Sequence, residues 1–80
     1  MPTVLDINGY KVVIYTDDHT PAHVHVRKSG GEVRIRIKCE PVELLRVQGP
    51  ISDREIRTAF EIVGENREML LKKWNEIHGS

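Results

Sequence analysis

Cysteine, aromatic residues and long apolar runs are scarce in this sequence, and each scarcity excludes a class of protein. The single cysteine, Cys39, excludes a disulfide framework and a cysteine-built zinc finger. No apolar run exceeds four residues, whereas a membrane-spanning helix needs about 20. With one Trp, one Phe and two Tyr, the chain has little means of stacking the bases of a single-stranded nucleic acid. Twelve basic residues balance twelve acidic ones, so no excess charge directs the chain to nucleic acid or to an anionic membrane.

The composition that remains is typical of one small folded domain. The chain has 80 residues, of which 39% are hydrophobic without counting its six glycines. A chain of this size buries about 60–65% of the surface that it exposes when unfolded, so its core is thin. Asp6 and Asn8 interrupt the first apolar stretch too early for a signal peptide. We therefore expect one domain over residues 1–80 and a cytoplasmic location.

A first β-hairpin is predicted around Asn8 and Gly9. Both residue types tolerate the positive φ angles that a type I′ turn requires. A two-residue loop fixes the register, and it then pairs opposite charges and apolar side chains across the strands. The facing pairs are Ile7 with Tyr10, Asp6 with Lys11, and Leu5 with Val12.

A second hairpin is predicted from residues 23–28 and 32–38, with Gly30 and Gly31 as its loop. This register pairs Val26 with Ile35 and Val24 with Ile37 on one face of the hairpin. The opposite face is then wholly basic and pairs Arg27 with Arg34, His25 with Arg36, and His23 with Lys38. Because like charges directly opposite one another are destabilising, this face needs either water or an anionic partner.

The second half of the chain predicts a short strand and then a helix. Residues 42–47 read as a strand or an extended connection after Pro41. Ser52 and Glu55 form a capping box, which starts a helix over 52–78. One apolar stripe follows at spacings of four and three: Ile56, Phe60, Val63, Arg67, Leu70, Trp74 and Ile77. The fold class we expect is α+β, an antiparallel meander of four to five strands over 1–47 with one long C-terminal helix packed on one face.

The length of this helix predicts an interface. A continuous helix over 53–77 is about 38 Å long, whereas strands of six residues extend about 20 Å. The surplus apolar surface predicts a homodimer or a partner contact through the end of the helix, and its residues are Leu70, Leu71, Trp74 and Ile77. The alternative is a helix broken at Gly64, in which the domain covers its own Trp74.

The chain resembles a family of short bacterial proteins that carries the number 4160 among domains of unknown function. The resemblance depends on residues 1–4, on Asp18-His19-Thr20-Pro21-Ala22-His23-Val24-His25-Val26, and on residues 40–44, 52–55 and 65–76. Relatives often have proline where this chain has Ala22 and glutamate where it has Gly64. The family implies no settled activity. It implies a product of a small two-gene module, sometimes of the toxin–antitoxin type, with a cognate protein encoded by the neighbouring gene.

His23 and His25 are the candidate chemical groups, since alternation along a strand points both rings to one face. Two imidazoles at this spacing can share a metal ion, with a third ligand from Asp17, Asp18 or His19. The predicted register, however, places Arg36 and Lys38 beside the pair, and these cations repel a divalent ion. We therefore expect no metal, and no pattern indicates another cofactor.

A metal-independent ribonuclease is the second interpretation of the two histidines. One ring would accept a proton while the other donates one. Arg27, Arg34, Arg36 and Lys38 would bind phosphate and stabilise the charge of the transition state. The RNA itself supplies the 2′-hydroxyl nucleophile, so whether the chain is an enzyme depends on whether both rings reach solvent.

A structural role for the histidines is the third interpretation, with ring nitrogens that satisfy loop backbone groups. The basic face would then bind RNA, DNA or an acidic protein, and the chain would be a non-catalytic adaptor. The function that we expect overall is that of one component of a two-gene, toxin–antitoxin-like module that uses this face to bind its partner.

Overall fold

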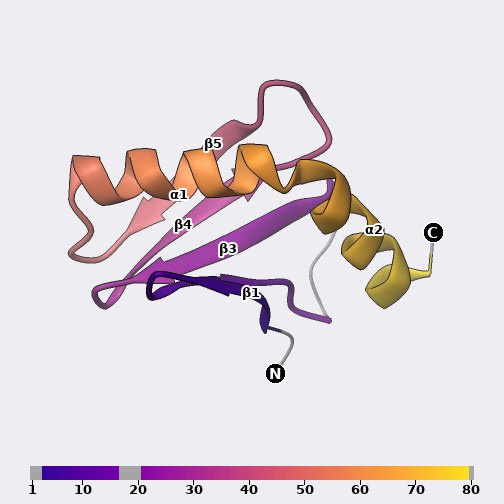
Figure 1. The fold of residues 1–80 in the computed structure, drawn as a ribbon, viewed down its shortest axis with the longest axis horizontal. Coiled ribbons are helices and arrows are strands. Elements are labelled where there is room, and N and C mark those ends of the chain that lie inside the picture. Colours follow the sequence, from indigo (N-terminus) through magenta and orange to yellow (C-terminus); the bar gives the residue numbers. More distant parts are fainter. Residues whose placement is uncertain (1–2, 17–20, 80) are drawn as a thin grey trace.

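The five strands form one antiparallel sheet in the order in which they occur along the chain (Figure 1). The computed structural model describes residues 3–16 and 21–79. Its strands are β1 (Thr3–Ile7), β2 (Tyr10–Val13), β3 (His23–Lys28), β4 (Gly31–Arg36) and β5 (Glu43–Gln48). Two helices follow, α1 (Asp53–Glu65) and α2 (Arg67–His78). The predicted α+β meander with its helical C-terminal part packed on the sheet is confirmed.

The first hairpin has the predicted register. Asn8 and Gly9 form the loop with φ angles of 51° and 83°. These positive values are those that Asn and Gly accept at the lowest cost. The pairs are Leu5 with Val12, Asp6 with Lys11, and Ile7 with Tyr10.

The second hairpin has a register that differs from the predicted one by two residues. Its loop is Ser29-Gly30, with φ angles of 55° and 82°, and Gly31 begins β4. Consequently Val26 pairs with Val33 rather than Ile35, and Arg27 pairs with Glu32 rather than Arg34. The other pairs are Val24 with Ile35, His25 with Arg34, and His23 with Arg36. A two-residue shift keeps every side chain on its predicted face.

Close packing explains why Gly31 lies in the strand and not in the loop. A Cβ at this position would lie 2.8 Å from Cβ of Ile51 and 3.0 Å from the carbonyl oxygen of Gln48. The connection from β5 to α1 therefore passes directly over Gly31. The shifted register also replaces a predicted pair of opposed arginines with Arg27 opposite Glu32, which is electrostatically favourable.

The helical part is interrupted, and the prediction of one continuous helix over 52–78 was wrong in this respect. Gly64 stays within α1, and the break lies at Asn66, with φ −112° and ψ 17°. The side-chain Nδ2 of Asn66 donates to the carbonyl oxygen of Ile62 at 2.8 Å, and so stabilises the end of α1. After the break, α2 turns down past the end of the sheet (Figure 1).

The change of direction at Asn66 places the apolar residues of α2 inside the domain. Leu70 is 0% exposed and Trp74 is 4% exposed, so both belong to the core of this chain. Leu71 and Ile77 are partly buried against the same core. The overhanging apolar surface that led us to predict an interface at these four residues is therefore absent from the described part of the chain.

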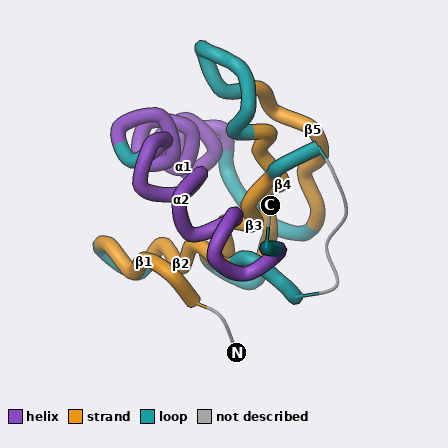
Figure 2. Tube along the Cα trace, turned by 90° about the vertical axis from the view of Figure 1, so that its right-hand side faces the viewer, coloured by secondary structure: helices purple, strands orange, loops and turns teal. Residues whose placement is uncertain are grey.

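The core lies between the sheet and the helices, and the strands curve around α1 and α2 (Figure 2). Ala59, Ile62 and Val63 of α1 pack on alternate residues of the strands. These strand residues are Tyr10, Val12, Val24, Val26, Val33 and Ile35. Neither helix of the described residues has the length and apolar character that crossing a bilayer requires.

The predicted capping box also joins the start of α1 to the β3–β4 turn. The Glu55 backbone N–H donates to Oγ of Ser52 at 3.2 Å, and the Ser52 backbone N–H donates to Oε1 of Glu55 at 3.0 Å. The Ser29 hydroxyl donates to the other carboxylate oxygen of Glu55 at 2.6 Å. One carboxylate thus caps the helix and fixes the hairpin turn.

Candidate functional site

Five cations lie on the face of the sheet that is opposite to α1, and we call this set the basic face. Strand alternation places them there, since Val12, Val26 and Val33 beside them point to the core. Its residues are Lys11, Arg27, Arg34, Arg36 and Arg46. Two pairs oppose like charges directly across neighbouring strands, Lys11 with Arg27 and Arg34 with Arg46. The basic face therefore contains repulsion between like charges.

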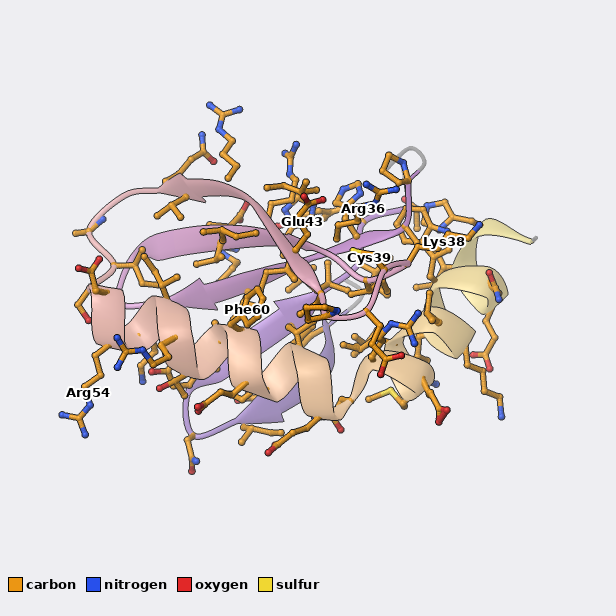
Figure 3. The ribbon with its side chains drawn as sticks, turned by 90° about the horizontal axis from the view of Figure 1, so that it is seen from above. Arg36, Lys38, Cys39, Glu43, Arg54 and Phe60 are labelled. Atoms are coloured by element: carbon orange, nitrogen blue, oxygen red, sulfur yellow. The ribbon has the colours of Figure 1, made fainter. Side chains whose placement is uncertain are left out.

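Two carboxylates compensate part of this charge. Oε1 of Glu32 lies 3.9 Å from Nε of Arg27, and Oε1 of Glu43 lies 3.5 Å from Nη1 of Arg36. Figure 3 shows Arg36 beside Glu43, which lie on neighbouring strands. No carboxylate pairs with Arg34 or Arg46 within residues 3–16 and 21–79. Nε of Arg34 is buried and has no hydrogen-bond acceptor among the described residues. Arg34 and Arg46 are thus the opposed pair in which neither member has a carboxylate partner among the described residues.

The two candidate histidines point to one face, as predicted, but both rings are buried. His23 is 8% exposed and His25 is 3% exposed. Nδ1 of His23 donates to the carbonyl oxygen of Pro21 at 2.9 Å, and Nδ1 of His25 donates to Oε2 of Glu32 at 3.0 Å. These bonds give each ring a structural function in the sheet.

Five rings form a continuous series around the two histidines. The ring centroids of Tyr15 and His25 lie 4.7 Å apart, those of His25 and His23 5.1 Å, and those of His23 and Trp74 5.4 Å. His78 stacks on Trp74 at 3.9 Å. The series joins β3 to α2. It also surrounds His23 and His25 with protein, which disfavours the ribonuclease interpretation because that mechanism needs both rings at the substrate.

The metal interpretation lacks a third ligand in the part of the chain that the structure describes. No three His, Cys, Asp or Glu residues gather there in a way that would hold an ion. The ligands considered from the sequence, Asp17, Asp18 and His19, lie outside the described residues. The expectation that no metal binds stays a prediction.

Three residues distinguish the basic face from the set predicted from the sequence. Lys38 follows the end of β4 and lines a hollow against α2 together with Arg67 and Trp74, so we assign it to that hollow and not to the basic face. Lys11 and Arg46 do belong to the basic face, and the sequence analysis included neither of them. The pairing of β4 with β5 is irregular between Arg34 and Ile35, so simple alternation from Glu43 does not give the side on which Arg46 lies.

Comparison with known proteins agrees with the resemblance noted from the motifs. A family model described as Domain of unknown function (DUF4160) matches residues 9–75, which is most of the chain. No curated protein and no solved structure matches it.

Proposed function

We propose that this chain, which belongs to the DUF4160 family, is a non-catalytic binding module whose basic face binds an acidic segment of a protein partner. The partner is the product of a neighbouring gene in a two-gene module of the toxin–antitoxin type. The observation that carries the proposal is the opposed pair Arg34 and Arg46, for which the described residues provide no carboxylate.

An acidic partner would relieve the repulsion between these arginines. Directly opposite residues of neighbouring strands lie about 4.5–5.5 Å apart at Cβ. Two guanidinium groups at this separation can bind one carboxylate from two sides, each with paired N–H donors. The partner's aspartate or glutamate would thus take the place that Glu32 takes beside Arg27 and Glu43 takes beside Arg36.

The composition of the basic face favours an acidic protein over nucleic acid. The chain has a net charge of zero, so it lacks the general attraction for polyphosphate that nucleic-acid-binding proteins use. Glu32 and Glu43 would also lie against any continuous phosphate backbone that crossed this face. A protein segment can place its carboxylates only where the arginines are unpaired.

Charge reversal tests the proposal with little effect on the fold. Arg34→Glu combined with Arg46→Glu keeps two like charges opposite each other and inverts only their sign. We expect this double variant to bind the neighbouring gene product at least tenfold more weakly in calorimetric titration. A matched control, Arg57→Glu with Lys72→Glu, makes the same change in charge at exposed positions of α1 and α2 and should leave the affinity unchanged.

Two measurements separate this proposal from the alternatives. Titration with a short single-stranded RNA at low salt tests the nucleic-acid interpretation. RNA binding that exceeds partner binding and is lost in the double variant would overturn the proposal. An RNA-cleavage assay of the wild type and of His25→Ala tests the ribonuclease interpretation, and cleavage that this substitution abolishes would also overturn it.

A further inference from the structure

A hollow of about 720 Å³ lies at the end of the sheet, against α2 and separate from the basic face. It lies within the range of about 300–1,000 Å³ that is usual for pockets that hold small organic groups. We call it the α2 pocket. Its lining includes Pro21, Ala22, Lys38, Arg67, Leu71 and Trp74.

The floor of the α2 pocket is apolar and firmly held. Ala22 and Trp74 are 3% and 4% exposed, and Leu71 is partly buried beside them. Trp74 lies between two imidazoles, with His23 at 5.4 Å and His78 stacked at 3.9 Å between ring centroids. The indole therefore has little freedom to turn into the pocket and fill it.

The charged residues that the described part of the chain contributes to the α2 pocket are positive. Among residues 3–16 and 21–79, Lys38 and Arg67 are the charged residues of its lining, and no carboxylate of these residues lines it. Nε of Arg67 donates to the carbonyl oxygen of Cys39 at 3.1 Å, and this bond fixes the guanidinium while its terminal N–H groups stay available. Within the part of the chain that the structure describes, neither cation has an ion-pair partner. The described lining thus combines apolar walls with two cations.

We propose that the α2 pocket binds an organic carboxylate with an aromatic or aliphatic body. The body lies against Leu71 and Trp74, and the carboxylate lies between Lys38 and Arg67. Such a group is either a free small acid or the C-terminal residue of a peptide, which share this chemistry. The α2 pocket is built from other residues than the basic face, so this proposal stands independently of the proposed function.

The single tryptophan of the chain reports occupancy directly, since Trp74 lines the α2 pocket. Titration with 3-phenylpropionate should give a saturable change of Trp74 fluorescence. The matched neutral compound, 3-phenylpropionamide, has nearly the same shape and no charge, and it should bind at least tenfold more weakly. Equal binding of acid and amide would overturn the proposal, as would the absence of a saturable change with the acid.

Variants of the two lining cations test whether the carboxylate of the ligand lies between them. Lys38→Gln should weaken binding of 3-phenylpropionate about tenfold, and since Lys38 is exposed this change leaves the fold intact. Arg67→Gln should weaken it similarly, but Arg67 also borders a hollow that contains Glu40 and Glu65, so Lys38→Gln is the decisive variant. Lys72→Gln, on an exposed position of α2 outside the lining, is the control. An unchanged affinity of Lys38→Gln would overturn the proposal.

A peptide distinguishes the two sources of the carboxylate. Ala-Ala-Ala-Phe with a free C-terminus is compared with its amidated form and with 3-phenylpropionate. Tighter binding of the free peptide identifies a protein C-terminus as the occupant, and tighter binding of 3-phenylpropionate identifies a small acid. Either result supports the proposal. The double variant at Arg34 and Arg46 should bind both acids normally, which separates failure of this proposal from failure of the proposed function.

Discussion

Arg46 faces Arg34 across the β4–β5 pair. Its positive charge favours binding of an acidic partner but lowers the stability of the fold, because it repels Arg34. Replacing Arg46 alone by glutamate creates an opposed Arg–Glu pair. Favourable cross-strand pairs of this kind contribute about 0.2–1 kcal/mol. We therefore expect Arg46→Glu to unfold at higher urea than the wild type while it binds the acidic partner more weakly. Arg57→Glu serves as the control, and a loss of stability in Arg46→Glu would contradict the assigned pairing.

Replacement by alanine should have opposite effects on stability at Gly31 and at Gly64. Gly31→Ala places a Cβ at 2.8 Å from Ile51 and should cost about 1–3 kcal/mol, as overpacked positions do. Gly64 lies in α1 with no atom within 4 Å of an added Cβ, and alanine is the better helix former by up to about 1 kcal/mol. Gly64→Ala should therefore stabilise the domain. Urea unfolding followed by circular dichroism measures both, and two changes of equal sign would contradict the packing described at Gly31.

The sequence predicted the loop of the first hairpin correctly because only one loop is possible there. It predicted the loop of the second hairpin wrongly because two loops are possible there. Asn8-Gly9 is flanked by strand residues on both sides, so only one loop fits. Ser29, Gly30 and Gly31 all accept turn conformations, and local preference does not select between the two loops they allow. The choice is made by Ile51, which packs on Gly31 from a distant part of the chain. A pattern of period two does not change when the register moves by two residues, so it could not reveal the difference.

Among the secondary-structure elements, α1 depends on a single carboxylate at its first turn. The Ser29 hydroxyl, followed by the Ser52 backbone N–H, holds the pKa of Glu55 below its ordinary value of 4.5. A lowered pKa in the folded state means that this charge adds to stability above pH 4.5, and that its contribution is lost as the pH falls through the folded-state pKa. The melting temperature of the wild type should therefore exceed that of Glu55→Gln at neutral pH.

This difference between the wild type and Glu55→Gln should shrink as the pH is lowered toward 3. Ser29→Ala removes the largest cause of the pKa shift, and it should reduce the same difference at neutral pH. Thermal unfolding at several pH values of four proteins gives the measurement: the wild type, Glu55→Gln, Ser29→Ala, and Ser29→Ala combined with Glu55→Gln. A difference that is independent of pH would show that Glu55 stabilises α1 without its charge.

The break between α1 and α2 could not be predicted from hydrophobic periodicity. The apolar stripe continues with spacings of four and three through Val63, Arg67 and Leu70, because both helices turn an apolar side to the core. Periodicity reports which side of a helix is buried and does not report where the axis changes direction. The local signal was Asn66, whose side chain bonds the Ile62 carbonyl and ends α1.

Because Leu70 and Trp74 lie in the core of the molecule, their substitution should lower the stability of the fold and not merely weaken an association between chains. Trp74→Ala removes a 4% exposed side chain, and losses of this kind cost about 3–5 kcal/mol. Small domains have about 5–15 kcal/mol of stability in total, so we expect a protein close to unfolding at 37 °C. Lys72→Ala, at an exposed position of the same helix, should change stability by about 0.5 kcal/mol or less.

Chemical denaturation and analytical ultracentrifugation of the same variants decide between core and interface. If Trp74→Ala unfolds normally but no longer associates, Trp74 is part of an interface, as the continuous apolar stripe first suggested. If it loses stability at any protein concentration, Trp74 belongs to the core of its own chain, which is the outcome we expect.

Part of the candidate site could be predicted from local patterns in the sequence, and the rest depends on how distant segments of the chain pack. Alternation placed Arg27, Arg34 and Arg36 on one face, and the structure keeps them there. It also extended β4 to Lys38, but the strand ends at Arg36 and Lys38 instead lines the α2 pocket. A pocket formed by α2 and the residues before β3 depends on how distant segments pack, which no local pattern in the chain reports.

The meander order of the sheet has a kinetic consequence. Every strand pairs with its neighbour in sequence, so the sheet forms by closing short loops, and short loops close fast. The contact of His23 with Trp74 is different, because it joins residues separated by 51 positions. We expect the hairpins to form early in folding and α2 to dock late. Variants at Trp74 would then accelerate unfolding and leave the folding rate nearly unchanged.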